Sequence, residues 1–333
     1  MSTENSLQKD TDGGENEGIV GVVLMTYGSA TTSAHVEDYF ERIYKGRASP
    51  ATIEDFKNRY RLIGRSPLID ITERQAALVQ EKLGRAHVVR AGMRHSAPFI
   101  DEAIAECKAA GATSLIGITL SPQFSSFIME GYKTTFMEAA TTYGLESDSV
   151  VVGPWDTEAH FIELLADRTR KSLKHLDAKF NTPVPVIFTT HSLPQRVVEK
   201  DPGYLEQLAA TIAAVREKLT TKDIEVESRS WSAAYQSAGH TPEEWLQPDL
   251  KDILKELATQ GAPAALIVPI QFLADHLEIL YDLDIAAKAQ CEELNIAYNR
   301  IELPNTDPLF IEALVAIATS VPRVPHDSTQ EPV

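Results

Sequence analysis

A histidine and a carboxylate in two short segments are the residues of this sequence best suited to bind a metal ion and to move protons. His191 lies in the segment THSLP (190–194), and Glu278 ends the segment ADHLE (274–278). Neutral imidazole titrates near physiological pH and also ligates Fe(II), and a nearby carboxylate can raise its basicity or accept a second proton. Because a structural zinc site has four closed ligands, two donors alone leave coordination positions open. Side chains of these two types, if they lie together, can hold a metal ion transiently.

Each of these residues also allows a structural interpretation, and the alternatives stay open at this point. A histidine after a strand is often a hydrogen-bonded structural residue, and a Tyr-Gly pair such as the one at Tyr27 is often only a turn. Asp275, Glu278 and Asp282 can equally be solvated charges on a helix. Glu278 and Asp282 are four residues apart, so they share one face if this segment is helical. What favours a functional site is that several such segments follow strand-like runs.

Apolar, β-branched runs alternate with amphipathic helical segments along the chain. The predicted strands are Ile19–Met25, His87–Ala91, Ser114–Leu120, Ser149–Val152, Val184–Thr189, Ile224–Ser230, Ala264–Ile270 and Ile296–Ile301. The predicted helices include Thr72–Leu83, Phe99–Ala110, Ala159–Leu173, Tyr204–Leu219 and Leu250–Leu257. Continuous apolar runs that alternate with helices are typical of parallel sheets covered on both faces. The pattern predicts an α/β fold of two doubly wound, Rossmann-like lobes, each with a parallel four-stranded sheet.

This architecture predicts where a ligand binds. In doubly wound sheets, ligands lie beyond the carboxyl ends of the strands. Tyr27 follows a strand of the first lobe, whereas His191 and Glu278 follow strands of the second. We therefore expect these residues to face one another across a cleft between the lobes.

The same pattern predicts the domain organisation. The N-terminal lobe is expected over 19–170 and the C-terminal lobe over 171–320. Residues 1–18 are polar and rich in Gly, Asn and Glu, which predicts a disordered leader. Residues 321–333 contain three prolines and no periodic pattern, which predicts a flexible tail.

Charge and cysteine content exclude several classes of function. The 333 residues include 48 acidic and 31 basic side chains, a net charge of −17, which repels a phosphate backbone and argues against nucleic acid. Cys107 and Cys291 cannot supply the ligands of an iron–sulfur cluster. No segment approaches the ~20 apolar residues of a transmembrane helix, no signal peptide is visible, and no GxGxxG or GxxxxGK[ST] motif follows a strand. We expect a cytoplasmic protein without an iron–sulfur cluster.

Taken together and in this order, the segments resemble the ferrochelatase family. The segments THSLP (190–194) and ADHLE (274–278) carry most of the resemblance. Support comes from SPL (66–68) before Ile71-Thr72, YQS (235–237) before Trp245-Leu246, and GMRH (92–95). The resemblance runs from about Gly21 to Val321. The segment MTYG (25–28) is similar to the soluble coproporphyrin III ferrochelatase branch of Gram-positive-type bacteria.

The resemblance implies roles for individual residues. His191 and Glu278 would be the catalytic residues and the metal ligands, and Tyr27 would be the axial ligand of iron in the product. Asp282 would belong to a path along which the metal enters. The porphyrin would be bound by Tyr44, Arg59, Tyr60, Ser66 and Tyr132. Fe(II) and a porphyrin, coproporphyrin III before others, would be the substrates, and a transient partner would donate iron or accept haem.

The acidic composition bears on how the porphyrin is held. A net charge of −17 does not favour a multiply anionic coproporphyrin, so local cations must overcome it. Arg59 is the strongest candidate, with Lys45 and Arg47 as helpers. Tyr44 stands where the branch often has an arginine that faces a propionate, and Lys45 could substitute for it.

Other positions depart from the pattern of the family. Gln123 replaces a histidine of some members, and Ala30 replaces a proline in the first turn. Ala286 replaces a glutamate one turn beyond Asp282, which weakens the hypothesis of a carboxylate track for the metal. These departures bear more on the identity of the porphyrin than on the insertion of a metal.

Three alternative functions remain beside coproporphyrin III metallation. The chain could be a protoporphyrin IX ferrochelatase, or a chelatase that loads cobalt or nickel into a tetrapyrrole of another pathway. It could also be a non-enzymatic haem-binding protein that uses Tyr27 as an axial ligand. Activity with each pair of metal and tetrapyrrole would separate the first two, whereas tight haem binding without metallation would indicate the third.

Overall fold

The computed structural model describes residues 18–220, 224–239 and 242–322. The strands are β1 (Ile19–Thr26), β2 (His87–Met93), β3 (Ala112–Thr119), β4 (Ser149–Val151), β5 (Val186–His191), β6 (Trp231–Gln236), β7 (Ala264–Pro269) and β8 (Ala297–Arg300). The α-helices are α1 (Val36–Tyr44), α2 (Pro50–Ile63), α3 (Leu68–Leu83), α4 (Ile100–Ala109), α5 (Ser126–Thr142), α6 (Ala159–Phe180), α7 (Gln195–Lys200), α8 (Gly203–Leu219), α9 (Leu250–Thr259), α10 (Leu277–Leu280), α11 (Lys288–Glu293) and α12 (Pro308–Ser320). Short helical segments are η1 (Ser33–His35), η2 (Gly84–Ala86), η3 (Glu146–Asp148) and the π-helical η4 (Asp282–Ala287). Almost all of the predicted leader and tail lies outside the described residues.

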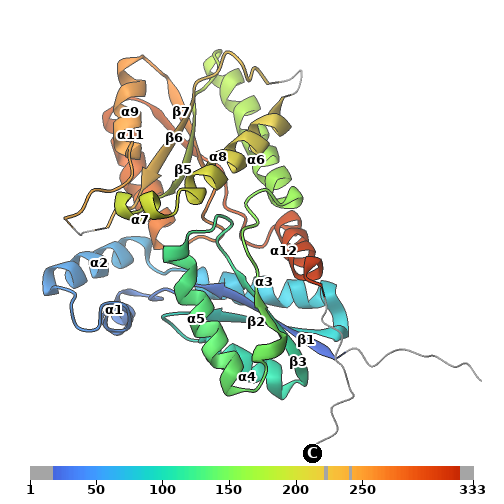
Figure 1. The fold of residues 1–333 in the computed structure, drawn as a ribbon. Coiled ribbons are helices and arrows are strands. Elements are labelled where there is room, and N and C mark those ends of the chain that lie inside the picture. The colour runs from blue at the N-terminus through green and yellow to red at the C-terminus, as the bar shows by residue number, and fades with distance from the viewer. Residues whose placement is uncertain (1–17, 221–223, 240–241, 323–333) are drawn as a thin grey trace, which may run out of the picture.

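The strands form two parallel sheets with the same order, β2-β1-β3-β4 and β6-β5-β7-β8. Figure 1 shows them as two lobes, one above the other, each with helices on both faces of its sheet. The predicted two-lobed α/β class is thereby confirmed. In each sheet the first strand of the lobe, β1 or β5, pairs with neighbours on both sides, so the chain reverses its winding there. The carboxyl ends of β1 and β5 are thus the places where a doubly wound sheet binds ligands.

One predicted strand is wrong. Residues 224–230 form no strand, and the corresponding strand, β6, runs over Trp231–Gln236. The segment 224–230 alternates apolar and charged residues and therefore imitates a half-buried strand. The real β6 lies at the edge of its sheet and contains small and polar residues, so it lacks the apolar run of a central strand. Gln236, placed in a loop by the prediction, lies opposite His191 in the parallel register.

The two faces of β1 contribute to two different cores. Val22 and Leu24 pack into a large cluster with α3, α6 and α12, whereas Val23 and Met25 pack with α4 and α5 on the other face. A strand alternates its side chains between faces, so a strand that is buried on both sides reads as one apolar run. This is why the sequence pattern located β1 correctly.

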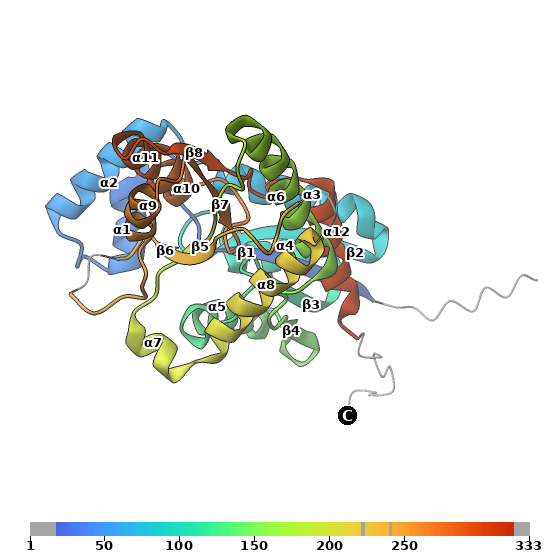
Figure 2. The same ribbon diagram turned by 90° about the horizontal axis from the view of Figure 1, so that it is seen from above.

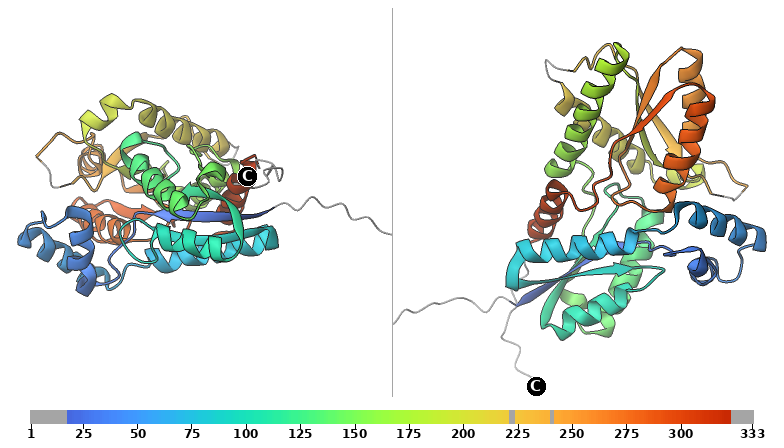
Figure 3. Two further views of the ribbon diagram at one scale, coloured as in Figure 1. Left: turned by 60° about the horizontal axis from the view of Figure 1, so that its bottom comes forward. Right: turned by 180° about the vertical axis from the view of Figure 1, so that it is seen from behind.

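The large core cluster continues through both lobes. It contains residues of β1 and β5 together with α6, α8 and α12. Figure 3 shows α12, the last helix of the described residues, beside α6 and α3, so this helix packs against the first lobe. The predicted boundary between residues 170 and 171 lies within α6, and it stays a prediction.

A smaller cluster joins α1 and α2 of the first lobe to α10 of the second. Phe40 and Tyr60 are buried there against Leu277. Seen from above in Figure 2, α1 and α2 lie at one side of the molecule, and α2 contacts α10. Because Leu277 precedes Glu278, this contact positions the predicted metal-binding carboxylate relative to the first lobe. In the described residues no helix is long and apolar enough to cross a bilayer.

Candidate active site

His191 is the last residue of β5, at the carboxyl end of a central strand. Its backbone N–H donates to Oε1 of Gln271 over 3.0 Å, and its Nδ1 lies 2.5 Å from the carbonyl oxygen of Ser192. A carbonyl can only accept, so Nδ1 carries a proton and donates it. In the neutral ring the other nitrogen, Nε2, then presents a lone pair. The local backbone thereby selects the tautomer that can take up a proton or a metal ion at Nε2.

Glu278 lies in the first turn of α10, directly opposite His191. Its Oε2 is 3.3 Å from Nε2 of His191. Within the described part of the chain, this buried oxygen has no hydrogen-bond partner. A lone pair and a carboxylate oxygen repel each other at this distance unless a cation, a proton or a metal ion, lies between them. The arrangement is therefore suited to exchange one cation for another.

Tyr27 follows β1 as His191 ends β5, so the two occupy equivalent positions in the two sheets. Tyr27 is 41% exposed, and the carbonyl of the next residue, Gly28, accepts a 2.8 Å hydrogen bond from Tyr39. Gly28 has a φ of +91°, and a Cβ there would lie 2.4 Å from Oγ of Ser96. Only glycine fits this turn.

The pKa of the Tyr27 phenol is affected by charged groups of both lobes. Burial raises the pKa of Tyr27, the guanidinium of Arg94 opposes this rise, and the carboxylate of Glu278 adds to it. Leu277, which precedes Glu278, lies in the same buried cluster as Ala30, three residues after Tyr27. The structure thus brings Tyr27 from the first lobe near Glu278 from the second, as the prediction of a shared site requires.

Three hydroxyls form a buried network behind this turn. Oγ of Ser29 lies 2.9 Å from the hydroxyl of Tyr60 and 2.9 Å from Oγ of Ser66. Tyr60 and Ser66 are 2% and 3% exposed, so both hold the loops together in this structure. Their predicted contact with the porphyrin stays a prediction. Sequence reasoning missed Ser29, which no motif singled out.

The buried Tyr60 predicts a loss of stability at alkaline pH. Burial raises the pKa of Tyr60 from 10.0 to about 12. Folding therefore favours the neutral phenol, and this stabilisation is complete below pH 10 and is lost as the pH rises towards 12. We expect the free energy of unfolding, measured with urea, to be lower at about pH 11 than at about pH 8. In Tyr60→Phe this decrease should be smaller by roughly 1–2 kcal/mol. An equal loss in the variant and in the wild type would contradict this assignment.

Arg59 and Asp282 contact each other across the lobes. Nη1 of Arg59 lies 3.6 Å from Oδ1 of Asp282, while Nη2 lies 2.8 Å from Asp55 on the same helix. The guanidinium also lies 5.0 Å from the ring centroids of Phe56 and Tyr281. The positive charge predicted to hold a propionate is thus shared with two carboxylates. The binding role of Arg59 stays a prediction.

The segment after Glu278 is wider than an α-helix. Asp282 begins the π-helical η4, and the carbonyl of Tyr281 accepts from the N–H groups of both Ile285 and Ala286, at 3.2 and 2.8 Å. Such widened turns are frequent at functional sites. Desolvation raises the pKa of Asp282, while Ser237 donates a hydrogen bond to it. Asp282 therefore has protein partners already, and its place on a metal path stays a prediction.

Two further predicted porphyrin contacts lie near this centre. Tyr44 ends α1 and is 38% exposed, and burial and then the charge of Glu278 raise its pKa. Tyr132, on α5, is 5% exposed, with the guanidinium of Arg94 5.9 Å from its ring centroid. The described residues contain no group of three or more His, Cys, Asp or Glu side chains that could hold a metal. The prediction that His191 and Glu278 bind the metal stays a prediction.

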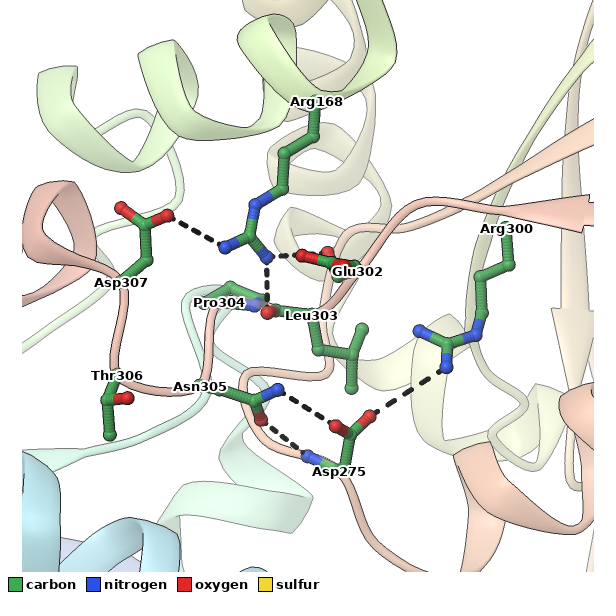
Figure 4. Close-up of a pocket in the computed structure, with 9 residues that line it drawn as sticks. All are labelled: Arg168, Asp275, Arg300, Glu302, Leu303, Pro304, Asn305, Thr306 and Asp307. Carbon is green, nitrogen blue, oxygen red and sulfur yellow. Dashed lines mark hydrogen bonds and ion pairs between the residues drawn. The ribbon is translucent and has the colours of Figure 1, made fainter. Parts of the chain in front are cut away.

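A polar pocket of about 430 Å³ lies behind the segment that carries Glu278. Figure 4 shows Asn305 clasping Asp275: its amide donates to Oδ2 over 2.8 Å, and its oxygen accepts from the backbone N–H over 2.9 Å. Arg300 lies 3.8 Å from the other oxygen of Asp275 and makes two hydrogen bonds to Asp284 in η4. Arg300 and Asn305 thus hold both ends of the segment that contains Glu278. No motif of the sequence pointed to them.

Asn305 is therefore expected to be a positioning residue for Glu278. It has a φ of +47°, which asparagine tolerates better than alanine. Asn305→Gly removes the amide without strain, and we expect a loss of about 1–3 kcal/mol in unfolding free energy and about a tenfold lower kcat. Asn305→Ala should lose about 1 kcal/mol more. Steady-state kinetics should show an unchanged KM for the porphyrin; an unchanged kcat in Asn305→Gly would contradict the role.

Comparison with known proteins agrees with this geometry. A sequence model described as ferrochelatase matches residues 19–321. The coproporphyrin III ferrochelatase of Oceanobacillus iheyensis is 33% identical over 90% of this chain and 95% of its own length. The coproporphyrin III ferrochelatase of Bacillus subtilis is also 33% identical, over 90% and 96%, and the ferrochelatase of Deinococcus radiodurans is 35% identical, over 91% and 96%.

Solved structures support the fold. The structure of SirB from Bacillus subtilis with Fe³⁺ has a TM-score of 0.51 at 12% identity and covers 91% of this chain and 95% of its own. A sirohydrochlorin chelatase, SirB of Bacillus subtilis subspecies spizizenii with cobalt, has a TM-score of 0.53 at 11% identity, with coverages of 91% and 94%. At such identities the likeness concerns architecture alone. The match of the family model over nearly all of the described chain, together with relatives at one-third identity, shows that this chain belongs to the ferrochelatase family.

Proposed function

We propose that this enzyme inserts Fe(II) into coproporphyrin III at the pair of His191 and Glu278. The observation that carries the proposal is the 3.3 Å approach of Nε2 of His191 to Oε2 of Glu278, with no other partner for that oxygen in the described chain. Two opposed acceptors bind a cation and release it easily, because neither supplies a complete coordination shell. This suits an ion that must pass on to the nitrogens of a porphyrin.

The proton balance of the reaction fits the same pair. The free-base porphyrin gains Fe²⁺ and loses its two pyrrole N–H protons. Nε2 of His191 can accept one proton, since Nδ1–H already donates to the carbonyl of Ser192, and Glu278 stabilises the resulting imidazolium. The carboxylate or water can take the second. Fe(II) exchanges its bound water for the ring nitrogens as the protons leave.

The proposed porphyrin lies between this pair and Tyr27. In this arrangement the phenol reaches the metal from the opposite face of the ring and becomes the axial ligand of the product. Tyr44, Arg59, Tyr60, Ser66 and Tyr132 are proposed to contact the ring or its propionates, as the resemblance implied. A rigid site that binds a bent ring better than a flat one exposes the nitrogen lone pairs to the metal.

The choice of coproporphyrin III rests on the named relatives. Those of Oceanobacillus, Geobacillus and Bacillus are called coproporphyrin III ferrochelatases, whereas those of Herpetosiphon and Deinococcus are called ferrochelatases. The test is to offer coproporphyrin III and protoporphyrin IX separately with Fe(II) without oxygen and to follow the loss of free-base fluorescence. Faster turnover of protoporphyrin IX would overturn the substrate while leaving the reaction class.

We also propose that the chain acts in the cytoplasm without an iron–sulfur cluster and meets its iron donor or haem acceptor transiently. Cys107 and Cys291 are free thiols, buried in the hydrophobic cores of different lobes. They therefore cannot ligate the same iron–sulfur cluster. Burial raises the pKa of both thiols, which fits structural cysteines. The test is a chemical analysis of the purified protein for iron and acid-labile sulfide. The absence of acid-labile sulfide would support this proposal.

A further inference from the structure

Arg94 is a partly buried arginine without an acidic partner. It follows β2, next to the turn after β1 that holds Tyr27, and its backbone N–H donates to the carbonyl of Thr26 over 3.0 Å. Across residues 18–220, 224–239 and 242–322, no carboxylate pairs with its guanidinium, although acidic residues outnumber basic ones. Other partly buried arginines differ: Arg59 and Arg300 each contact two carboxylates. A guanidinium left unpaired in so acidic a protein is available to an anionic ligand.

The structure holds this guanidinium in a niche on α5. A Cβ built on Gly131 would lie 2.2 Å from Cζ and Nη1 of Arg94, so the guanidinium packs against the bare backbone of Gly131 and would have to move if a larger residue stood there. Gly131 needs no unusual backbone conformation, since its φ is not positive. The guanidinium also lies 5.9 Å from the ring centroid of Tyr132. Packing therefore orders the side chain before any ligand binds, which lowers the entropic cost of binding.

The guanidinium lies beside the proposed porphyrin site. The backbone N–H groups of Arg94 and His95 donate to the carbonyls of Thr26 and Tyr27, each over 3.0 Å. The turn that carries Arg94 therefore lies directly beside the turn that carries Tyr27, and its guanidinium lies over the ring of Tyr132. Tyr27 is the residue proposed to contact the metal face of the product. A carboxylate on the rim of a ring bound there would come within reach of Arg94.

We propose that Arg94, assisted by the hydroxyl of Tyr132, binds a propionate of the porphyrin and thereby favours coproporphyrin III over less carboxylated porphyrins. The inference rests on the proposed function and deepens it. Coproporphyrin III carries a propionate on every pyrrole ring, whereas protoporphyrin IX has vinyl groups in place of some. The bulk charge of −17 opposes the more anionic ring, and Arg59 is already shared between Asp55 and Asp282. An uncommitted guanidinium supplies the missing attraction.

The test compares the affinity of free-base coproporphyrin III with that of its methyl ester, which has the same ring and no carboxylate charge. Fluorescence titration should give a Kd about tenfold or more weaker for coproporphyrin III in Arg94→Gln, and a change of about twofold or less for the ester. Arg94→Lys keeps the positive charge but loses the bidentate geometry of the guanidinium. Its Kd for coproporphyrin III should therefore lie between those of the wild type and Arg94→Gln. Arg90→Gln is the matched control, because Arg90 lies on β2, the strand that Arg94 follows, and pairs with the exposed Glu106. It should leave both Kd values unchanged.

Two outcomes would overturn the inference. One is an unchanged Kd for coproporphyrin III in Arg94→Gln, and the other is an equal weakening for the acid and the ester. Unaltered ester binding also shows that the variant is folded, and Arg94→Lys serves if Arg94→Gln does not fold. Wild-type protein that metallates neither porphyrin would contradict the proposed function instead. Wild-type metallation with an unaffected Arg94→Gln would contradict only the role of Arg94.

Discussion

Replacing His191 with alanine should lower the rate of iron insertion by about 10²–10⁴-fold, while the protein still folds and binds free-base porphyrin. The side chain is 30% exposed, and the hydrogen bond from the backbone N–H to Gln271 survives the change. The variant loses the one nitrogen that can accept a pyrrole proton beside Glu278. Initial rates of fluorescence loss with Fe(II), in the absence of oxygen, measure the effect.

The control for this experiment is another histidine with a carboxylate partner. His160 lies on α6, 2.9 Å from Glu158, and is 44% exposed. His160→Ala should retain the wild-type rate, since its charge pair lies outside the site. A His191→Ala enzyme that works at the wild-type rate would refute the assigned role. Loss of porphyrin binding together with activity would instead indicate that His191 supports the shape of the site.

Replacing Glu278 with glutamine should reduce activity by about 10²–10³-fold and raise the KM for Fe(II), without loss of stability. The new amide can donate a hydrogen bond to Nε2 of His191, which the carboxylate at 3.3 Å cannot do. That bond occupies the lone pair needed for a proton or for iron. It also removes the repulsion between two acceptors, so the free energy of unfolding should stay the same or rise by about 1 kcal/mol.

Opposite changes in stability and activity make this prediction specific. Urea unfolding and steady-state kinetics, run on the same preparation, measure both. Glu256→Gln, an exposed change on α9, should alter neither quantity. If Glu278→Gln keeps the wild-type KM for Fe(II), Glu278 does not hold the metal. A variant that is both inactive and markedly destabilised would mean that the carboxylate has a structural partner that the geometry does not show.

The sequence by itself determined the two-lobed architecture, because burial on both faces makes each central strand a continuous apolar run. Seven of the eight predicted strands overlap observed ones. The exception is β6, which lies at the edge of its sheet and pairs with only one strand. Its small and polar residues do not form a continuous apolar run. The motifs around His191 and Glu278 were also readable, since each follows a strand in the chain.

Only the tertiary structure decided how those residues meet and which other side chains serve them. Three contacts join residues from separate segments of the chain. They are the 3.3 Å approach of Glu278 to His191, the ion pair of Arg59 with Asp282 and the hydrogen bond of Asn305 to Asp275. The niche that Gly131 leaves for Arg94 also joins separate segments. Periodic patterns report whether a residue faces the core of its own element, which is a local property. Which charge finds a partner depends on the packing of the whole chain. Arg59 was predicted to hold a propionate but lies between Asp55 and Asp282, whereas the partly buried Arg94 has no carboxylate partner among the described residues.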